Sequence, residues 1–203
     1  MNSLIENNDR IMIKQTKEWG EILTGFETRN RYELLDGDGN RIGNAAEEGG
    51  GIGTALLRNF LGKCRACKIH IYDRNGEKVG RGDKPFRFFF HRMDVYEGGR
   101  KIGAIQRKFS ILNRDFTLEG PDGRELLLIR SPLFKIWTFK LLHEDKEMGR
   151  ISKKWGGLLK EAFTDADTFG VEFSHSDLPA EVKKLLVVAV FLIDFVCFEK
   201  SKN

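Results

Sequence analysis

The feature that most constrains this chain is the apolar stretch at residues 185–198, LLVVAVFLIDFVCF, which is interrupted only by Asp194. A helix that is apolar on every side must be enclosed by protein or by lipid. At about 1.5 Å per residue this stretch reaches roughly 21 Å, whereas a bilayer core is about 30 Å thick. An aspartate inside a membrane span would add a cost of roughly 2.5–3.5 kcal/mol. We therefore predict a helix buried inside its own protein, with insertion into lipid as the alternative. The side chains that either environment would enclose include Leu185, Leu186, Val190, Ile193 and Phe195.

A recurring pattern fills much of the preceding sequence: an alternating apolar run, a polar turn with glycine, and a second apolar run. It occurs at residues 32–43, 69–80, 93–103 and 116–129, and in a looser form at 139–151. Asp-Gly, Asn-Gly and Gly-Gly between such runs are strong β-hairpin signals, because these residues tolerate positive φ in tight turns. A meander of this size tends to close, since open sheet edges are a liability. We therefore predict a mainly β fold, a closed antiparallel β-barrel wrapped around the hydrophobic C-terminal helix.

The composition is that of an ordinary globular protein in a reducing compartment. The chain has 203 residues, enough for a sizeable core, and we expect a single domain over residues 1–203 with its core at about 10–199. Three cysteines do not suggest a disulfide scaffold, and the first residues, MNSLIENNDRIM, lack a secretory signal. We expect an intracellular protein, cytoplasmic or at the cytoplasmic face of a membrane. A net charge of +4 permits anionic lipid or nucleic acid as a partner without requiring either.

No motif typical of a hydrolase or a transferase stands out. The sequence contains neither a GxSxG nucleophile elbow nor an HExxH zinc motif. Cys64 and Cys67 form a lone CxxC without the second ligand pair that a structural zinc site needs. We interpret them as reduced cysteines beside a strand.

The segment DADTFG, which starts at Asp165, is similar to the beginning of a calcium-binding loop. Such loops place acidic residues at positions one and three, here Asp165 and Asp167, and glycine at position six. Position five is Phe169 and position twelve is Ser176, so Asp177 would have to complete the oxygen ligands. The segment predicts a Ca²⁺ site at Asp165, Asp167 and Asp177, and a plain turn leading into a strand is the alternative.

Basic residues cluster loosely in three parts of the sequence, close to tryptophan and phenylalanine. Such clusters hold proteins at lipid headgroups, with about 1 kcal/mol for each well-placed cation. The alternative is a solvated polar face of the barrel. The residues that we predict to contact anionic headgroups are Arg58, Arg65, Lys84, Arg87, Arg92, Arg150, Lys153 and Lys154.

Longer motifs resemble those of the phospholipid scramblase family. Residues 149–173 (GRISKKWGGLLKEAFTDADTFGVEF) and 191–199 (FLIDFVCFE) resemble the family's C-terminal motifs. Residues 23–34 (LTGFETRNRYEL), followed by AAE at 45–47, resemble its N-terminal motif. The resemblance therefore covers nearly the whole chain.

The resemblance implies a fold related to the tubby C-terminal domain, with about twelve strands around a hydrophobic C-terminal helix. It also implies an activity: Ca²⁺-triggered, ATP-independent movement of phospholipids between leaflets, with the calcium loop at Asp165 to about Asp177. Three hypotheses remain open: a lipid translocator, a non-catalytic module that binds anionic lipid headgroups, and a nucleic-acid-binding regulatory protein. The third would show an affinity that falls steeply with salt. We favour a scramblase-family protein that interacts with phospholipid membranes.

Overall fold

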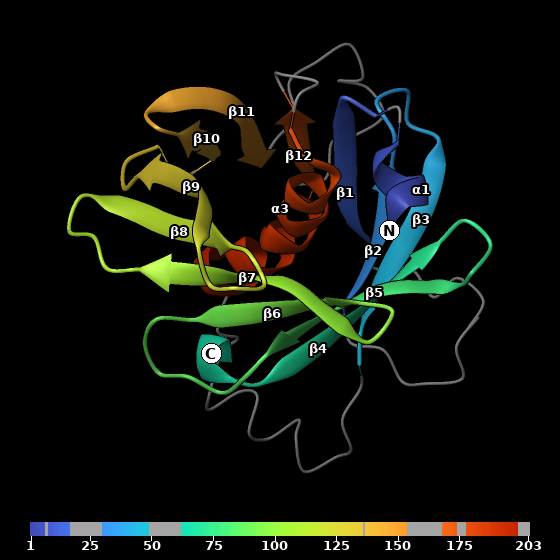
Figure 1. Cartoon of the computed structure of the whole chain (residues 1–203), viewed down its shortest axis with the longest axis horizontal. Coiled ribbons are helices and arrows are strands. Elements are labelled where there is room, and N and C mark those ends of the chain that lie inside the picture. The colour runs from blue at the N-terminus through green and yellow to red at the C-terminus, as the bar shows by residue number, and fades with distance from the viewer. Residues whose placement is uncertain are drawn as a thin grey trace.

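The protein is a closed antiparallel β-barrel with a helix through its interior (Figure 1). The computed structural model describes residues 1–6, 8–16, 30–48, 62–135, 137–153, 168–173 and 178–198. The predicted fold class, including about twelve strands and a buried C-terminal helix, is confirmed. The twelve strands are β1 (Arg10–Thr16), β2 (Arg31–Leu35), β3 (Arg41–Glu47), β4 (Cys67–Asp73), β5 (Lys78–Lys84), β6 (Arg92–Glu97), β7 (Arg100–Lys108), β8 (Asn113–Glu119), β9 (Glu125–Pro132), β10 (Thr138–His143), β11 (Lys146–Lys153) and β12 (Thr168–Phe173). The helical elements are α1 (Asn2–Ile5), η1 (Gly62–Cys64), α3 (Ala180–Ile193) and η2 (Asp194–Phe198).

Each strand pairs with its neighbours in sequence, and β1 closes the barrel against β12. The five predicted hairpins are confirmed as β2–β3, β4–β5, β6–β7, β8–β9 and β10–β11. Gly98 and Gly99, which join β6 to β7, have φ of +55° and +80°, as a tight hairpin turn requires. The closing pair places Arg10 opposite Glu172, and their side chains form an ion pair of 2.9 Å.

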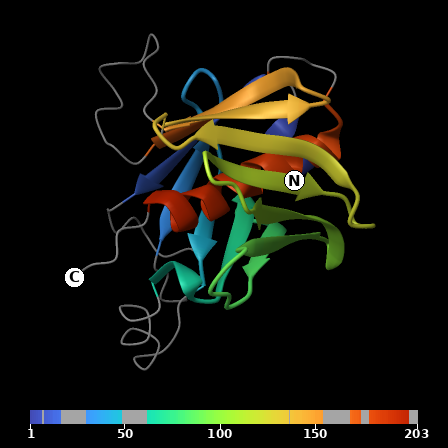
Figure 2. The same cartoon turned by 90° about the vertical axis from the view of Figure 1, so that its left-hand side faces the viewer.

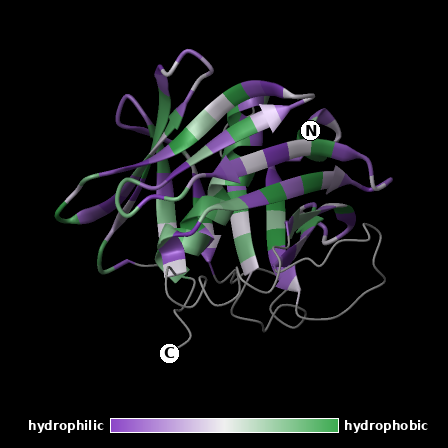
Figure 3. Ribbon diagram, turned by 90° about the horizontal axis from the view of Figure 1, so that it is seen from below, coloured by the Kyte–Doolittle hydropathy of each residue, from purple (hydrophilic) through white to green (hydrophobic). Residues whose placement is uncertain are grey.

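Side chains alternate between the barrel interior and its outer surface. In β4, for example, Ile69 and Ile71 are fully buried, whereas the neighbouring Lys68 is exposed. The same alternation appears as green and purple bands along the strands in Figure 3. A period of two is what a sheet with one buried face requires, and it directs the apolar half of each strand toward α3.

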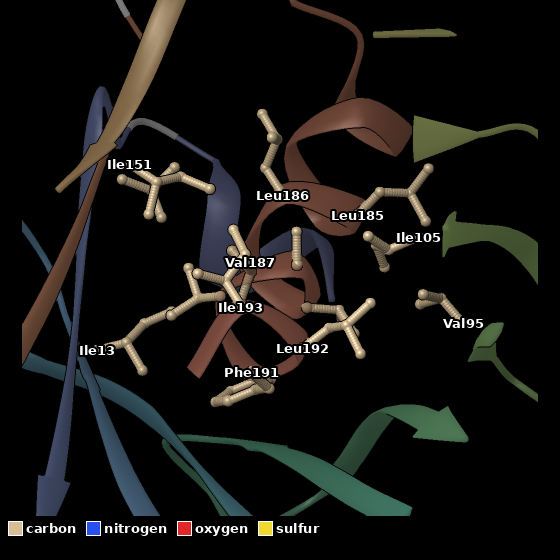
Figure 4. Packing of buried hydrophobic residues seen from close by; sticks show 14 of the residues in the cluster. Ile13, Val95, Ile105, Ile151, Leu185, Leu186, Val187, Phe191, Leu192 and Ile193 are labelled. Atoms are coloured by element: carbon tan, nitrogen blue, oxygen red, sulfur yellow. The ribbon is translucent and has the colours of Figure 1, made fainter. Parts of the chain in front are cut away.

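The helix α3 runs through the middle of the barrel (Figures 1 and 2). The predicted enclosed residues lie in the protein core: Leu185, Leu186, Val190 and Ile193 are 0% exposed and Phe195 is 3% exposed. Side chains of α3 point toward residues of several different strands, among them Ile13, Val95, Ile105 and Ile151 (Figure 4). The hydrophobic core is therefore formed by the helix and the inner faces of the strands together.

Close packing between helix and barrel depends on small residues at the contact. A Cβ atom added at Gly103 of β7 would lie 2.9 Å from Leu185 Cδ1, closer than real Cβ contacts allow. The turn after α3 widens into η2, a single π-helical segment that begins at Asp194. None of the helices in the described ranges is both long enough and apolar enough to cross a membrane.

Candidate functional site

One end of the barrel exposes large apolar side chains. In the described ranges, every exposed large hydrophobic residue lies in one of the three loops that join β5 to β6, β7 to β8 and β9 to β10. Because consecutive strands are antiparallel, these alternate loops share one end of the barrel, on the left in Figure 1. We call this surface the apolar rim. Its residues are Phe86, Phe88, Phe89, Phe90, Phe109, Ile111, Leu112, Leu133, Phe134 and Trp137.

The opposite end of the barrel has a different character. Its hairpin turns, at residues 36–40, 74–77, 98–99, 120–124 and 144–145, consist of polar residues, glycine and proline. At the rim, by contrast, Phe89 and Phe134 are 78% and 82% exposed. Exposed apolar side chains that gather in one place mark an interaction surface, whereas scattered ones do not. The asymmetry therefore assigns the interaction surface to one end of the molecule.

The loop between β5 and β6 holds its phenylalanines in place. The Arg87 backbone N–H donates to the Cys64 carbonyl at 3.0 Å, and Gln106 Nε2 donates to the Phe90 carbonyl at 2.8 Å. The rings of Phe86 and Phe88 meet edge to face at 4.9 Å between centroids. Phe90 has a φ of +51°, a conformation that costs a bulky residue of the order of 1 kcal/mol. A strained conformation that the surroundings maintain at an exposed aromatic residue is typical of a functional loop.

Inside the rim, η2 lies at the mouth of the barrel and carries a buried carboxylate. The Asp194 carboxylate accepts a hydrogen bond from Tyr32 Oη at 3.1 Å and lies 3.5 Å from Lys153 Nζ. Lys153 Nζ also sits 4.2 Å from the centre of the Phe198 ring. These contacts compensate the charge of Asp194 and fix the end of the helix against β2 and β11.

A second buried ion pair lies at the same end. Glu47, at the end of β3, is 1% exposed and forms a two-pronged pair with the Arg65 guanidinium, which is itself 5% exposed. Asn30 Nδ2 donates to the same carboxylate at 2.8 Å. The guanidinium lies 4.9 Å from the centre of the Phe195 ring, and Lys84 Nζ donates to the Arg65 carbonyl. Arg65 therefore links the segment before β4 to β3 through the ion pair and to η2 through the Phe195 ring.

The structure places the predicted headgroup-binding cations in several different environments. Arg65, Lys84 and Lys153 are buried at the mouth, and Arg87 is exposed in the rim. Arg92 and Arg150 lie on the outer barrel surface in ion pairs, Arg92 with Asp94 at 3.0 Å and Arg150 with Glu172 at 3.4 Å. Burial of Asp94, the partner of Arg92, opposes its ionisation, but hydrogen bonds from Lys101 and Arg92 lower the pKa of Asp94. The six described cations therefore do not form one surface patch, and their headgroup role stays a prediction. Arg58 and Lys154 lie outside the described residues.

The predicted calcium ligands, Asp165, Asp167 and Asp177, also lie outside the described residues. Within the described ranges, no group of three or more His, Cys, Asp or Glu side chains is placed to hold a metal ion. Cys64 and Cys67 are free thiols, and Cys67 begins β4.

The apolar rim was not identified from the sequence, although the sequence contains a signal for it. The five hairpin turns at one end carry glycine, asparagine or acidic residues, whereas the loops that alternate with them contain FRFFF (86–90), FSIL (109–112) and LF (133–134). Apolar residues are usually interpreted as strand or core, so these runs draw attention only when the strand bounds are known. When every second loop of an antiparallel barrel carries exposed apolar residues, those residues indicate an interaction surface at one end of the barrel.

Comparison with known proteins gives a consistent result. A family model described as Scramblase matches residues 1–200. The chain is similar to phospholipid scramblase 1 of Homo sapiens, with 33% identity over 208 residues that cover 95% of this chain and 64% of that protein. It is 31% identical to phospholipid scramblase 1 of Rattus norvegicus over 96% of this chain and 61% of that protein. Phospholipid scramblase 2 of Homo sapiens is 31% identical over 96% of this chain and 69% of that protein.

The chain thus spans less than two thirds of the length of the two phospholipid scramblase 1 proteins. Among solved structures, an X-ray structure of a protein from Arabidopsis thaliana covers 91% of this chain and 90% of its own, with 11% identity and a TM-score of 0.49.

Proposed function

Since this chain belongs to the scramblase family, we propose that it binds phospholipid membranes and that the apolar rim is its contact surface. The observation that carries this proposal is the gathering of the exposed large apolar side chains at one end of the barrel. Transfer of a Phe, Leu or Ile side chain out of water is favourable by about 1.5–3 kcal/mol. Several loop tips that enter the headgroup region together would hold the barrel at a membrane.

The charges at the rim favour an anionic membrane. Arg87 lies among the phenylalanines of residues 86–90, and Lys135 directly follows Phe134; both cations are exposed. A cation near an anionic bilayer surface contributes about 1 kcal/mol to binding. Apolar tips interleaved with cations combine the two attractions that a reversible peripheral membrane protein needs.

Removal of the most exposed rim phenylalanines is expected to weaken membrane binding. The triple variant Phe88→Ser, Phe89→Ser and Phe134→Ser should bind sealed vesicles of phosphatidylcholine and phosphatidylserine at least about tenfold more weakly than the unmodified protein. The reason is that it loses the favourable free energy of transferring three phenylalanine side chains out of water. Co-sedimentation with the vesicles measures the dissociation constant.

A matched control carries three neutral substitutions in turns at the opposite end of the barrel, Asn40→Ser, Asn75→Ser and Pro121→Ser. This control should bind vesicles as the unmodified protein does. Both triple variants should keep the melting temperature of the unmodified protein, since all of the substituted positions are exposed. Equal vesicle binding by the two triple variants would exclude the rim as the contact surface.

We extend the proposal to the movement of phospholipids between leaflets without ATP, with Asp165, Asp167 and Asp177 as the residues that would hold Ca²⁺ through their carboxylates. The buried position of α3 favours a second candidate, a module that binds the membrane without translocating lipid. In that case the helix serves only as the core of the barrel, and the rim alone meets the membrane.

A reconstitution experiment separates these two candidates. Vesicles carry a fluorescent phospholipid in both leaflets, and a membrane-impermeant quencher is added in Ca²⁺ and then in chelator. For a translocator we expect quenching to proceed beyond the outer leaflet, and Asp165→Asn with Asp167→Asn to abolish the Ca²⁺ response. Quenching that stops at about half of the signal in both conditions, with the protein bound to the vesicles, would establish the binding module and reject translocation.

A further inference from the structure

A group of cations lies at the mouth of the barrel directly beneath the apolar rim. Arg107 near the end of β7 and Arg114 near the start of β8 share the inner face of the sheet, because Arg107 pairs with Phe116 and Arg114 is two residues from Phe116. Arg107 Nη1 reaches to 4.0 Å from Cys197 Sγ of η2, and its guanidinium lies 5.5 Å from the centre of the Phe116 ring. The backbone N–H of Arg87 donates to the carbonyl of Cys64, the residue after Lys63, and the charges of Lys63 and Arg87 act on His91 together with that of Arg107. We call Lys63, Arg87, Arg107 and Arg114 the cation cluster.

The cation cluster differs from Arg65 and Lys153, the two ion-paired cations at the mouth, in its lack of counter-charge. Arg65 pairs with Glu47, and Lys153 pairs with Asp194, so the side formed by β2, β3 and β11 is neutralised. In the part of the chain that the structure describes, no carboxylate lies within ion-pair distance of any member of the cation cluster. Arg114 Nη1 is buried and has no hydrogen-bond partner there. Like charges gathered without an acid are costly unless an anion joins them.

His91 is a buried side chain beside the cation cluster. It directly precedes β6 and faces the mouth opposite Arg107, whose backbone N–H donates to the His91 carbonyl at 2.8 Å. The side chain is 3% exposed, and its Nδ1 has no hydrogen-bond partner among the described residues. Burial, and then the charges of Lys84, Lys63, Arg107 and Arg87, lower the pKa of His91 to about 4. The buried Nδ1 of His91 adds a further polar atom without a partner to the region where these cations act.

We propose that the cation cluster binds the phosphate group of a phospholipid headgroup, with Arg107 and Arg114 as its principal ligands. This inference rests on the proposed function, because the apolar rim places lipid beside the cluster. Guanidinium groups suit the task because their planar forks donate two parallel hydrogen bonds to phosphate oxygens. Acyl chains would meet the rim phenylalanines while the phosphate enters the mouth, so the two surfaces recognise the two halves of one lipid. A nucleic acid offers the phosphate without the acyl chains.

The first test uses dimethyl phosphate, a phosphodiester monoanion without acyl chains, and therefore does not depend on membrane binding. Proton NMR of the imidazole signals follows the pKa of His91 with increasing dimethyl phosphate, against sodium chloride at equal ionic strength. An anion among the cations should raise the pKa of His91 by about one unit or more, while the imidazole signals of the exposed His143 do not respond to dimethyl phosphate. An unchanged His91 pKa at saturating dimethyl phosphate would overturn the proposal, whatever the vesicle experiments give.

The second test compares two variants of equal net charge. Arg107→Gln with Arg114→Gln removes the proposed ligands, and Arg100→Gln with Arg124→Gln removes two exposed arginines of the opposite end. On vesicles with phosphatidylserine the first variant should bind about 25-fold more weakly and the second less than twofold, at about fivefold for each cation at the membrane. Their binding to phosphatidylcholine vesicles through the rim should differ less, since the apolar tips are intact in both.

The outcomes separate this inference from the proposed function. If the unmodified protein binds vesicles but the two variants are equally affected, the cation cluster is not the phosphate site and the rim proposal stands. If the unmodified protein binds no vesicles while dimethyl phosphate still shifts His91, the phosphate site stands and its membrane source is rejected. Displacement of dimethyl phosphate by a single-stranded oligonucleotide, and not by phosphatidylserine vesicles, would assign the site to nucleic acid and overturn the lipid proposal.

Discussion

Leu186→Asp is expected to prevent the barrel from folding. Leu186 is 0% exposed and points from α3 into the core. The substitution removes a buried side chain worth about 1.5–3 kcal/mol and places a carboxylate without a partner in an apolar surrounding, which costs several kcal/mol more. The total of about 5 kcal/mol or more is comparable to the whole free energy of unfolding of a typical domain. Urea unfolding followed by circular dichroism, together with the soluble yield, measures the effect.

Ala180→Asp is the matched control for this experiment. Ala180 is the first residue of α3 and is exposed, so a carboxylate there meets water and the positive end of the helix dipole. We expect it to change the free energy of unfolding by less than about 0.5 kcal/mol. A Leu186→Asp protein that remains folded but no longer binds vesicles would contradict the core assignment and show that α3 reaches lipid.

The same burial limits any mechanism in which α3 leaves the barrel. Nearly every apolar side chain of α3 is fully buried against the strands. At about 1.5–3 kcal/mol for each large side chain, exposure of the helix to water would cost well over 10 kcal/mol. Thermal motion cannot supply that free energy at a useful rate. Translocation by this chain would therefore require either lipid that replaces the barrel as it releases the helix, or a route along the outer surface with α3 in place.

The sequence predicted the parts of the fold that depend on local chemistry. Hairpins with Asp-Gly, Asn-Gly or Gly-Gly turns follow from residues that are adjacent in sequence, and the buried helix follows from its length and its uniform apolarity. The closure of the barrel depends on β1 and β12, which are far apart in sequence and carry no signal of their pairing. The tendency of a large meander to close predicted a barrel, but the pairing of these two particular strands became known only from the structure.

The candidate site could not be assembled from the sequence because strand periodicity separates neighbours. Lys84 and Arg92 belong to one basic cluster in sequence, yet Lys84 faces the interior while Arg92 pairs with acids on the outer surface. Arg107 and Arg114 are separated in sequence by a rim loop and lie at the same end of the inner face only because β7 and β8 form a hairpin. The sequence predicts one helix over residues 185–198, whereas the α-helix ends at Ile193 and Asp194 begins a π-helical segment. The partners of a polar residue in an apolar helix can be identified only when the positions of the surrounding strands are known.

Glu47→Ala is expected to have the second large effect on stability. It removes the carboxylate that accepts from both Arg65 and Asn30, and the Arg65 guanidinium remains buried against the Phe195 ring. Loss of one member of a buried ion pair costs about 3–5 kcal/mol because the remaining charge keeps its desolvation penalty. Urea unfolding should therefore show a midpoint far below that of the unmodified protein.

Two further variants show whether that loss belongs to the buried pair. Asp122→Ala removes the carboxylate of an exposed ion pair, in which Arg124 is 79% exposed, and should change the free energy of unfolding by less than about 0.5 kcal/mol. The double variant Glu47→Leu with Arg65→Met removes both charges and should recover most of the loss, because two apolar side chains of similar size can replace a buried pair. If the double variant is no more stable than Glu47→Ala, the stabilisation comes from the contacts of each side chain separately. In that case the ion pair does not hold the segment before β4 against η2.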